Sequence, residues 1–203
     1  MMSSGECHLC KQKFNKKDMV QHLRSCIERE NEESGKRAFH IMVDGLYQPE
    51  YWIHIIMPDE TKLNVLDEFL RDFWLECCGH ASEFTILEES YGMDMDIILN
   101  DLLSPGMEFY HTYDFGSPTE LRLKVISEIE CSDEFGPIQI LARNDTPSVL
   151  CGCGKEATWI CFECSLDGDG WLCDECAEEH GCGEDMFLPV VNSPRVGVCG
   201  YEG

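Results

Sequence analysis

Cysteine and histidine pairs near the start of the chain have the spacing of metal ligands. Two residues separate Cys7 from Cys10, and three separate His22 from Cys26. Two ligands with two residues between them fit a tight turn, and two ligands four positions apart lie on one face of a helix. The four side chains can therefore surround one tetrahedral ion, and we expect that ion to be zinc.

This first segment resembles the C2H2 zinc-finger family, with a cysteine in place of the last histidine. Phe14 and Met19 occupy positions where a ββα finger buries its small core. Because so short a segment cannot fold on apolar burial alone, zinc must supply roughly 10–16 kcal/mol of apparent stabilisation. The resemblance implies possible contacts to nucleic acid from five polar residues: Asn15, Lys16, Lys17, Asp18 and Gln21. One finger reads only about 3 base pairs, so docking on a protein is an equally good interpretation.

Four more ligand pairs lie in the last quarter of the chain. They are Cys151 with Cys153, Cys161 with Cys164, Cys173 with Cys176, and His180 with Cys182. Eight ligands at these intervals suit two tetrahedral sites. In an interleaved arrangement, the first and third pairs form one site and the second and fourth pairs form the other. Sequential pairing remains an alternative, and Cys199 is a ninth candidate that could replace Cys182.

The order of these pairs is similar to that of B-box and other RING-like modules. Together with the first segment, they predict three bound zinc ions. Iron in a rubredoxin-like knuckle is the alternative. The residues that follow, 188–203, are extended and apolar, and we expect either a strand that packs on this zinc core or a docking peptide.

The charge of the chain is strongly acidic and unevenly distributed. The net charge is −24, with 15 basic and 39 acidic residues. Residues 1–37 carry +2, whereas residues 38–203 carry −26. The larger part must repel nucleic acid and anionic lipid. We therefore expect a protein partner, with nucleic-acid contact possible only through residues 7–26.

The sequence lacks the features of a membrane or exported protein. Its densest apolar stretch, residues 51–57, is far shorter than the ~20 residues that a membrane-spanning helix needs. The first residues contain neither a basic nor an apolar region of a signal peptide. We expect a cytoplasmic protein without membrane contact, whose cysteines serve metal chemistry rather than disulfides.

The middle of the chain predicts an α+β domain with an antiparallel sheet and one main packed helix. Apolar positions such as Leu63, Leu66 and Leu70 form one stripe of a helix over residues 62–77, with Thr61 as its N-cap. A second, short helix is expected at 96–103. Strands are expected at 37–43, 50–57, 83–88, 107–115, 120–129 and 137–143. His54 and His111 fall on these strands, and we expect them in the core or at its rim.

Several motifs of this domain resemble the plasmid pRiA ORF-3-like family in order and spacing. They are Tyr51-Trp-Ile-His-Ile55, the segment from Leu66 to Trp74, Gly79-His-Ala-Ser-Glu-Phe84, and Pro105-Gly-Met-Glu-Phe109 followed by Thr112-Tyr-Asp-Phe-Gly116. The resemblance covers about residues 38–130 and implies a fold without an assigned reaction. Family members continue after the last motif with Asp, Trp and His, whereas this chain has Ser117-Pro-Thr-Glu120.

These observations divide the chain into a finger (1–30), a linker (31–37), an α+β domain (38–148) and a binuclear zinc module with an extended tail (149–203). The metal modules are expected to flank the central domain. We expect a non-catalytic zinc-binding protein that serves as an interaction or regulatory adaptor. A regulator that touches DNA or RNA through the finger is the alternative.

A second alternative is an enzyme that uses the central domain. Its candidate residues are His80, Glu83, His111 and Asp114. A metal cluster of Cys77 and Cys78 with His80 and Glu83 is also conceivable. Adjacent cysteines rarely ligate one ion well, so we expect a structural role for Cys77 and Cys78.

Overall fold

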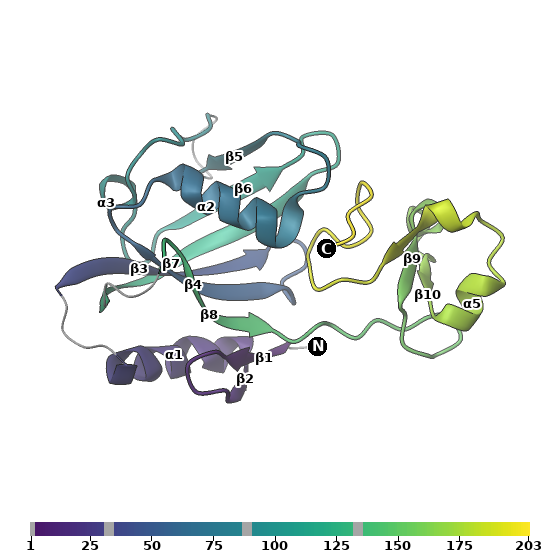
Figure 1. Cartoon of the computed structure of the whole chain (residues 1–203), viewed down its shortest axis with the longest axis horizontal. Coiled ribbons are helices and arrows are strands. Elements are labelled where there is room, and N and C mark those ends of the chain that lie inside the picture. The colour runs from purple at the N-terminus through teal and green to yellow at the C-terminus, as the bar shows by residue number, and fades with distance from the viewer. Residues whose placement is uncertain (1–2, 31–34, 87–90, 132–135) are drawn as a thin grey trace.

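An eight-stranded antiparallel sheet forms the centre of the molecule in a computed structural model that describes residues 3–30, 35–86, 91–131 and 136–203 (Figure 1). The strand order is β2-β1-β8-β4-β3-β7-β6-β5. The strands are β1 (Ser4–Cys7), β2 (Lys13–Asn15), β3 (Lys36–Gly45), β4 (Trp52–Pro58), β5 (Ser82–Thr85), β6 (Glu108–Tyr113), β7 (Thr119–Cys131) and β8 (Gln139–Asn144). The predicted α+β class is confirmed. Residues 87–88 of the strand expected at 83–88 lie outside the described residues.

Strand β4 is buried on both faces of the sheet, which explains its continuous run of apolar residues. Ile53 and Ile55 belong to the larger core cluster, whereas Trp52 and Ile56 belong to a second cluster. Successive side chains of a strand point to opposite faces. Each face of β4 is therefore covered by a different part of the chain. His54, also on β4, is buried as expected.

The main helix α2 (Leu63–Leu70) covers the larger cluster and continues as a π-helical turn, η1 (Arg71–Leu75). Lys62 rather than Thr61 is the N-cap, and no side chain caps the helix. The widened turn is closed by the backbone N–H of Glu76, which donates to the Arg71 carbonyl oxygen at 2.8 Å. The second expected helix is a single turn, α3 (Leu99–Leu102).

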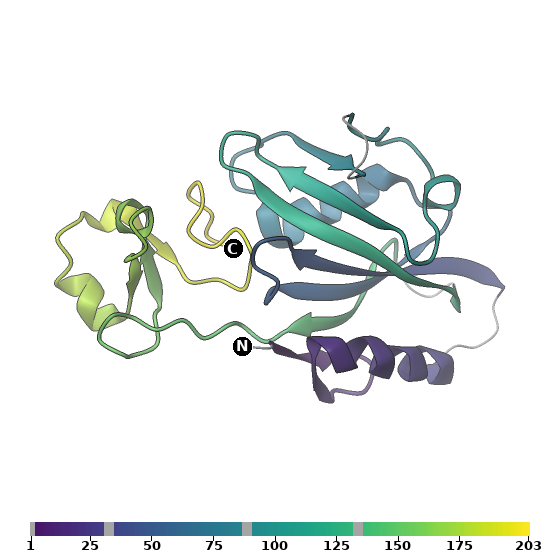
Figure 2. The same cartoon turned by 180° about the vertical axis from the view of Figure 1, so that it is seen from behind.

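The opposite face of the sheet is covered by helix α1 (Lys16–Glu30), which belongs to the N-terminal segment (Figure 2). Its residues Met19 and Leu23 are fully buried in one cluster with Trp52. Strand β1 pairs with β8, and Gly5 lies opposite Asn144. The finger thus shares both a sheet and a core with the central domain. Residues 31–34 of the expected linker lie outside the described residues, and Lys36 already begins β3.

The cysteine-rich segment forms a small body beyond one end of the large sheet (Figures 1 and 2). A three-stranded sheet of order β10-β9-β11 lies at its centre. Its elements are β9 (Trp159–Cys161), α4 (Phe162–Ser165), β10 (Trp171–Leu172), α5 (Asp174–Glu178), a 3-10 turn η2 (Glu184–Met186) and β11 (Phe187–Pro189). Within the described ranges, none of the helices combines the length and the hydrophobicity of a membrane-spanning segment.

The C-terminal segment, residues 190–203, returns to the central domain after β11. The Ser193 hydroxyl donates to the Trp74 carbonyl oxygen at 2.6 Å, and the Trp74 indole N–H donates to the Asn192 carbonyl oxygen at 3.1 Å. Arg195 is fully buried. The strand expected on the zinc core is β11, and the tail after it contacts both bodies. Ser193 bonds Trp74 of the central domain, whereas Gly197 lies directly against Ile160 of β9.

Candidate metal centres

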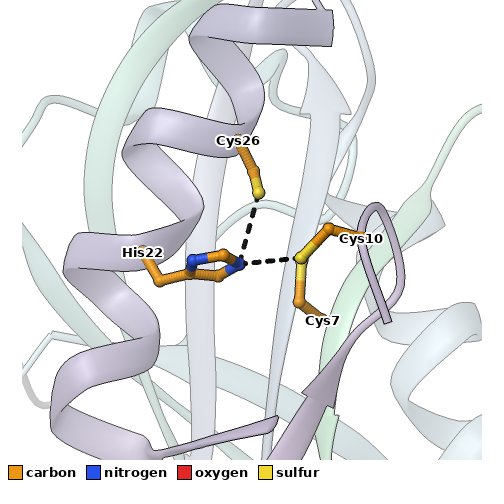
Figure 3. A group of neighbouring side chains, drawn as sticks. All are labelled: Cys7, Cys10, His22 and Cys26. Atoms are coloured by element: carbon orange, nitrogen blue, oxygen red, sulfur yellow. Dashed lines mark hydrogen bonds between the residues drawn. The ribbon is translucent and has the colours of Figure 1, made fainter. Parts of the chain in front are cut away.

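The four predicted ligands of the finger lie together at the junction of the β1–β2 turn and helix α1. Their ligand atoms are all within 4.8 Å of one another. His22 Nε2 is 3.2 Å from both the Cys10 and the Cys26 sulfur (Figure 3). A tetrahedral zinc ion holds sulfur and nitrogen ligands about 3.5 Å apart, because its bonds are about 2.3 and 2.0 Å long. The group therefore has the dimensions of a metal centre.

The surroundings of this group orient and tune the ligands. The Phe14 ring stacks on His22 with ring centroids 4.0 Å apart, and Arg29 donates to the Cys26 sulfur at 3.0 Å. Burial lowers the pKa of His22, so its ring is in the neutral form that binds metals. Burial raises the pKa of Cys7 to about 11. A divalent cation reverses this penalty, because a coordinated thiol loses its proton.

The eight predicted C-terminal ligands form two groups with the interleaved pairing. One group is Cys151, Cys153, Cys173 and Cys176, and the other is Cys161, Cys164, His180 and Cys182. In the first, the sulfurs of Cys153 and Cys173 are 3.6 Å apart. In the second, the Cys164 sulfur is 3.3 Å from His180 Nε2 and 3.7 Å from the Cys182 sulfur. Cys182, and not Cys199, completes the second group.

The thiols of both groups have strongly shifted pKa values. Hydrogen bonds from the backbone N–H groups of Cys153 and Cys173 lower the pKa of Cys151 to about 6. Neighbouring thiols raise the pKa values of Cys176 and Cys182 to about 12. Sulfurs in such close contact, four in the first group and three in the second, cannot all ionise by themselves, since like charges repel. A central divalent ion removes this conflict.

Two of the five residues proposed for nucleic-acid contact cap the start of helix α1. The Asn15 side-chain oxygen accepts the backbone N–H of Asp18 at 3.0 Å, and its amide donates to the Asp18 carboxylate at 2.6 Å. This is the ordinary geometry of an N-cap. Lys17 and Gln21 are exposed. Of the five residues, these two are therefore the ones that are exposed and take no part in the cap.

Lys16 has a structural contact with the sheet. Its ammonium group donates to the Asp44 carboxylate and, at 2.9 Å, to the Pro49 carbonyl oxygen. Asp44 is fully buried and also accepts from Arg122 at 2.7 Å. Buried carboxylates require such partners. Lys16 thus joins α1 to β3 and β7.

The four residues of the enzyme hypothesis are divided among different places. His80 Nε2 lies 3.5 Å from the Asp114 carboxylate. His111 is fully buried and bonds Asp67 of α2 at 2.7 Å. Glu83 precedes the buried Phe84 on β5, so its side chain points to the other face of that strand. Only His80 and Asp114 come together.

A fourth group of ligand type contains three of the four residues of the cluster weighed from the sequence, with Cys199 in the place considered for Glu83. It joins Cys77, Cys78 and His80 to Cys199. The first three are close in the sequence, but Cys199 lies 119 residues after His80. Local spacing is the signal that reveals metal ligands in a sequence, and it is lost over such a distance.

Comparisons with known proteins give little further information. No family model matches the chain, and no curated protein matches it. One similar solved structure is the crystal structure of a protein of unknown function from Methanosarcina mazei Go1, with 16% sequence identity and a TM-score of 0.46. The match covers 53% of this chain and 69% of that chain.

Proposed function

We propose that this is a non-catalytic zinc-binding protein whose ions hold its two ends in shape and which acts as an interaction adaptor. The main observation in support is that each predicted group offers four ligand atoms within 4.8 Å of one another. Structural zinc sites have four protein ligands, whereas catalytic sites keep one position open for water or substrate. Complete ligand sets therefore favour a structural role.

Zinc is favoured over iron by the chemistry of the ligands. Two of the three predicted groups contain three cysteines and one histidine, and the third contains four cysteines. Both sets are common for structural zinc, whereas a rubredoxin-like iron site uses four cysteines. One type of ion then serves all three groups.

Native mass spectrometry of the intact protein, with cobalt substitution, tests the metal proposal. Cys10→Ser, Cys153→Ser and Cys164→Ser should each lower the number of bound ions by one. The cobalt-loaded protein should show the intense visible absorption of tetrahedral Co²⁺ with thiolate ligands. A purified protein without bound ions, or spectra of five- or six-coordinate cobalt, would contradict the proposal.

The adaptor role is supported by the surface of the C-terminal zinc module. Residues 151–189 hold ten acidic residues and one basic residue. Two apolar side chains next to this charge are exposed, Phe162 by 41% and Leu166 by 76%. Exposed apolar groups with a charged rim are typical of docking surfaces. The charge favours a basic polypeptide as the partner.

Site-specific photocrosslinking in cells tests the adaptor role. A photoreactive amino acid at position 166 should crosslink to a protein with a basic surface. The matched control is the same amino acid at Tyr47, which is 73% exposed on the central domain. Equal crosslinking at both positions, or none at position 166, would contradict the proposed surface.

The central domain is part of the same proposal. We assign it to the plasmid pRiA ORF-3-like family on the motifs between Tyr51 and Gly116. That family implies a scaffold without a reaction, in agreement with an adaptor. Closely packed free thiols also fit a reducing cytoplasm. The scaffold then holds the finger on one face and the acidic module beyond one end.

A further inference from the structure

Two segments of the chain, residues 77–80 and the C-terminal segment, bring four ligand side chains together at the end of the large sheet. Cys77 and Cys78 follow the π-helical turn η1, and His80 precedes β5. Cys199 comes from the C-terminal segment. His80 Nε2 is 2.9 Å from the Cys78 sulfur and 3.3 Å from the Cys199 sulfur. The ring nitrogen thus contacts thiols from two distant parts of the sequence.

The distances within this group match those of the other three. The Cys78 sulfur is 3.7 Å from the Cys77 sulfur and 3.9 Å from the Cys199 sulfur. Two sulfurs on a tetrahedral zinc ion are about 3.8 Å apart, since each Zn–S bond is about 2.3 Å long. A disulfide requires a sulfur–sulfur distance of about 2.05 Å. The arrangement is therefore that of ligands and not of a covalent bond.

The backbone bends at both sides of the group so that the side chains converge. Gly79 has a φ of +80°, which turns the chain between Cys78 and His80. Cys199 has a φ of +50°, a conformation that residues other than glycine rarely adopt. Such a conformation persists only where the surroundings stabilise it. A bond from the Cys199 sulfur to a metal ion would supply such stabilisation.

The positively charged side chain of Arg195 beside the group would balance a metal centre with excess negative charge. A zinc ion with three thiolates and one neutral imidazole carries a net charge of −1. The buried Arg195 donates to the Cys77 sulfur at 3.4 Å and to the Asp114 carboxylate at 2.8 Å. Its guanidinium group also lies over the Tyr113 ring. Hydrogen bonds of this kind orient ligands and balance their charge.

We propose that Cys77, Cys78, His80 and Cys199 bind a fourth structural zinc ion, which fastens the C-terminal segment to the central domain. Adjacent cysteines are unusual ligands for one ion, and the turn at Gly79 is what allows them to share it with His80. The ion would anchor the segment that follows β11, whereas the other end of the acidic module follows β8 of the large sheet. This site is independent of the three that support the proposed function.

Ion counting by native mass spectrometry of the full chain with Zn²⁺ tests this site. The wild-type protein should carry four ions, and Cys199→Ser should carry three. Cys131→Ser, which removes a thiol from the last residue of β7, is the matched control and should keep four. Three ions in the wild-type protein, with no change in Cys199→Ser, would overturn the fourth site and leave the proposed function standing.

Two further measurements separate coordination from other roles of Cys199. Cys199→His should restore the fourth ion, because imidazole is also a zinc ligand. Cys199→Ser should increase hydrogen exchange at Tyr201, whose N–H donates to the Val198 carbonyl oxygen at 3.0 Å. Failure of histidine to restore the ion, or a mass 2 Da lower from a Cys78–Cys199 disulfide in the denatured protein, would also overturn the proposal.

Discussion

Two histidines at the centre of the sheet are buried as a neutral pair. His40 on β3 and His54 on β4 are bonded ring to ring at 2.9 Å. Burial lowers the pKa of His40 to about 4 and that of His54 well below its usual value. In the contacts found for them, the two rings bond each other and neither bonds a carboxylate. The folded state therefore disfavours protonation of both rings.

This pair predicts that acid destabilises the protein below neutral pH. An unfolded histidine binds a proton near pH 6.5, whereas His40 in the folded state does so near pH 4. The stabilisation is complete above pH 6.5 and is lost as the pH falls toward 4, by about 3 kcal/mol for one such ring. Chemical unfolding at several pH values measures it.

His40→Gln is the control for the metal sites, which also release protons and ions in acid. The variant should show a shallower loss of unfolding free energy between pH 6.5 and 4, at ion occupancies matched by native mass spectrometry. Superimposable pH curves for the two proteins would refute the role of this pair.

At the same scale, residue types and spacing predicted much of the candidate metal chemistry. Ligands within one finger or one module are close in the sequence, so their grouping could be inferred. The interleaving of the C-terminal pairs could be suggested but not decided, because spacing permits sequential pairing as well. The convergence of His80 with Cys199 depends on how two distant segments pack. No local pattern encodes that.

At the scale of elements, residue patterns located β3 to β8 of the large sheet to within a few residues over the described part of the chain. What they could not predict is the pairing of β1 with β8, which brings residues 5–7 next to 142–144. Edge pairing depends on backbone hydrogen bonds that leave little trace in side-chain pattern. The same holds for the π-helical turn η1, which interrupts a stripe that reads as one helix.

Gly5 provides a test of this shared sheet. A Cβ atom at this position would lie 2.2 Å from the Arg143 carbonyl oxygen and 2.6 Å from the Trp52 ring. Gly5→Ala should therefore separate β1 from β8 and lower the free energy of unfolding by about 1–3 kcal/mol. Thermal and chemical unfolding measure the loss.

Gly136→Ala is the matched control, because a Cβ atom there meets no atom within 4 Å. It should change the stability by less than about 0.5 kcal/mol. If Gly5→Ala were as stable as this control, the finger would have to be a separate unit rather than part of the sheet.

At the scale of the whole molecule, apolar cores and candidate metal groups stabilise different parts of the chain. The large sheet has a core on each face, one under α2 and one under α1. The C-terminal module has only a three-stranded sheet of two- and three-residue strands. A body this small requires ions or other crosslinks for stability. Composition and cysteine spacing predicted that the central domain has an apolar core and that the C-terminal module depends on ions. They did not predict that the tail returns to the central domain.

Hydrogen exchange of the intact protein, before and after removal of metal by a strong chelator, tests the central claim most directly. Ion removal is verified by native mass spectrometry of the same samples. We predict that the amides of β9, β10 and β11 lose their protection, whereas those of β3, β4 and β7 keep it. Unchanged protection of the small sheet in protein free of metal would contradict the claim that ions hold this module together.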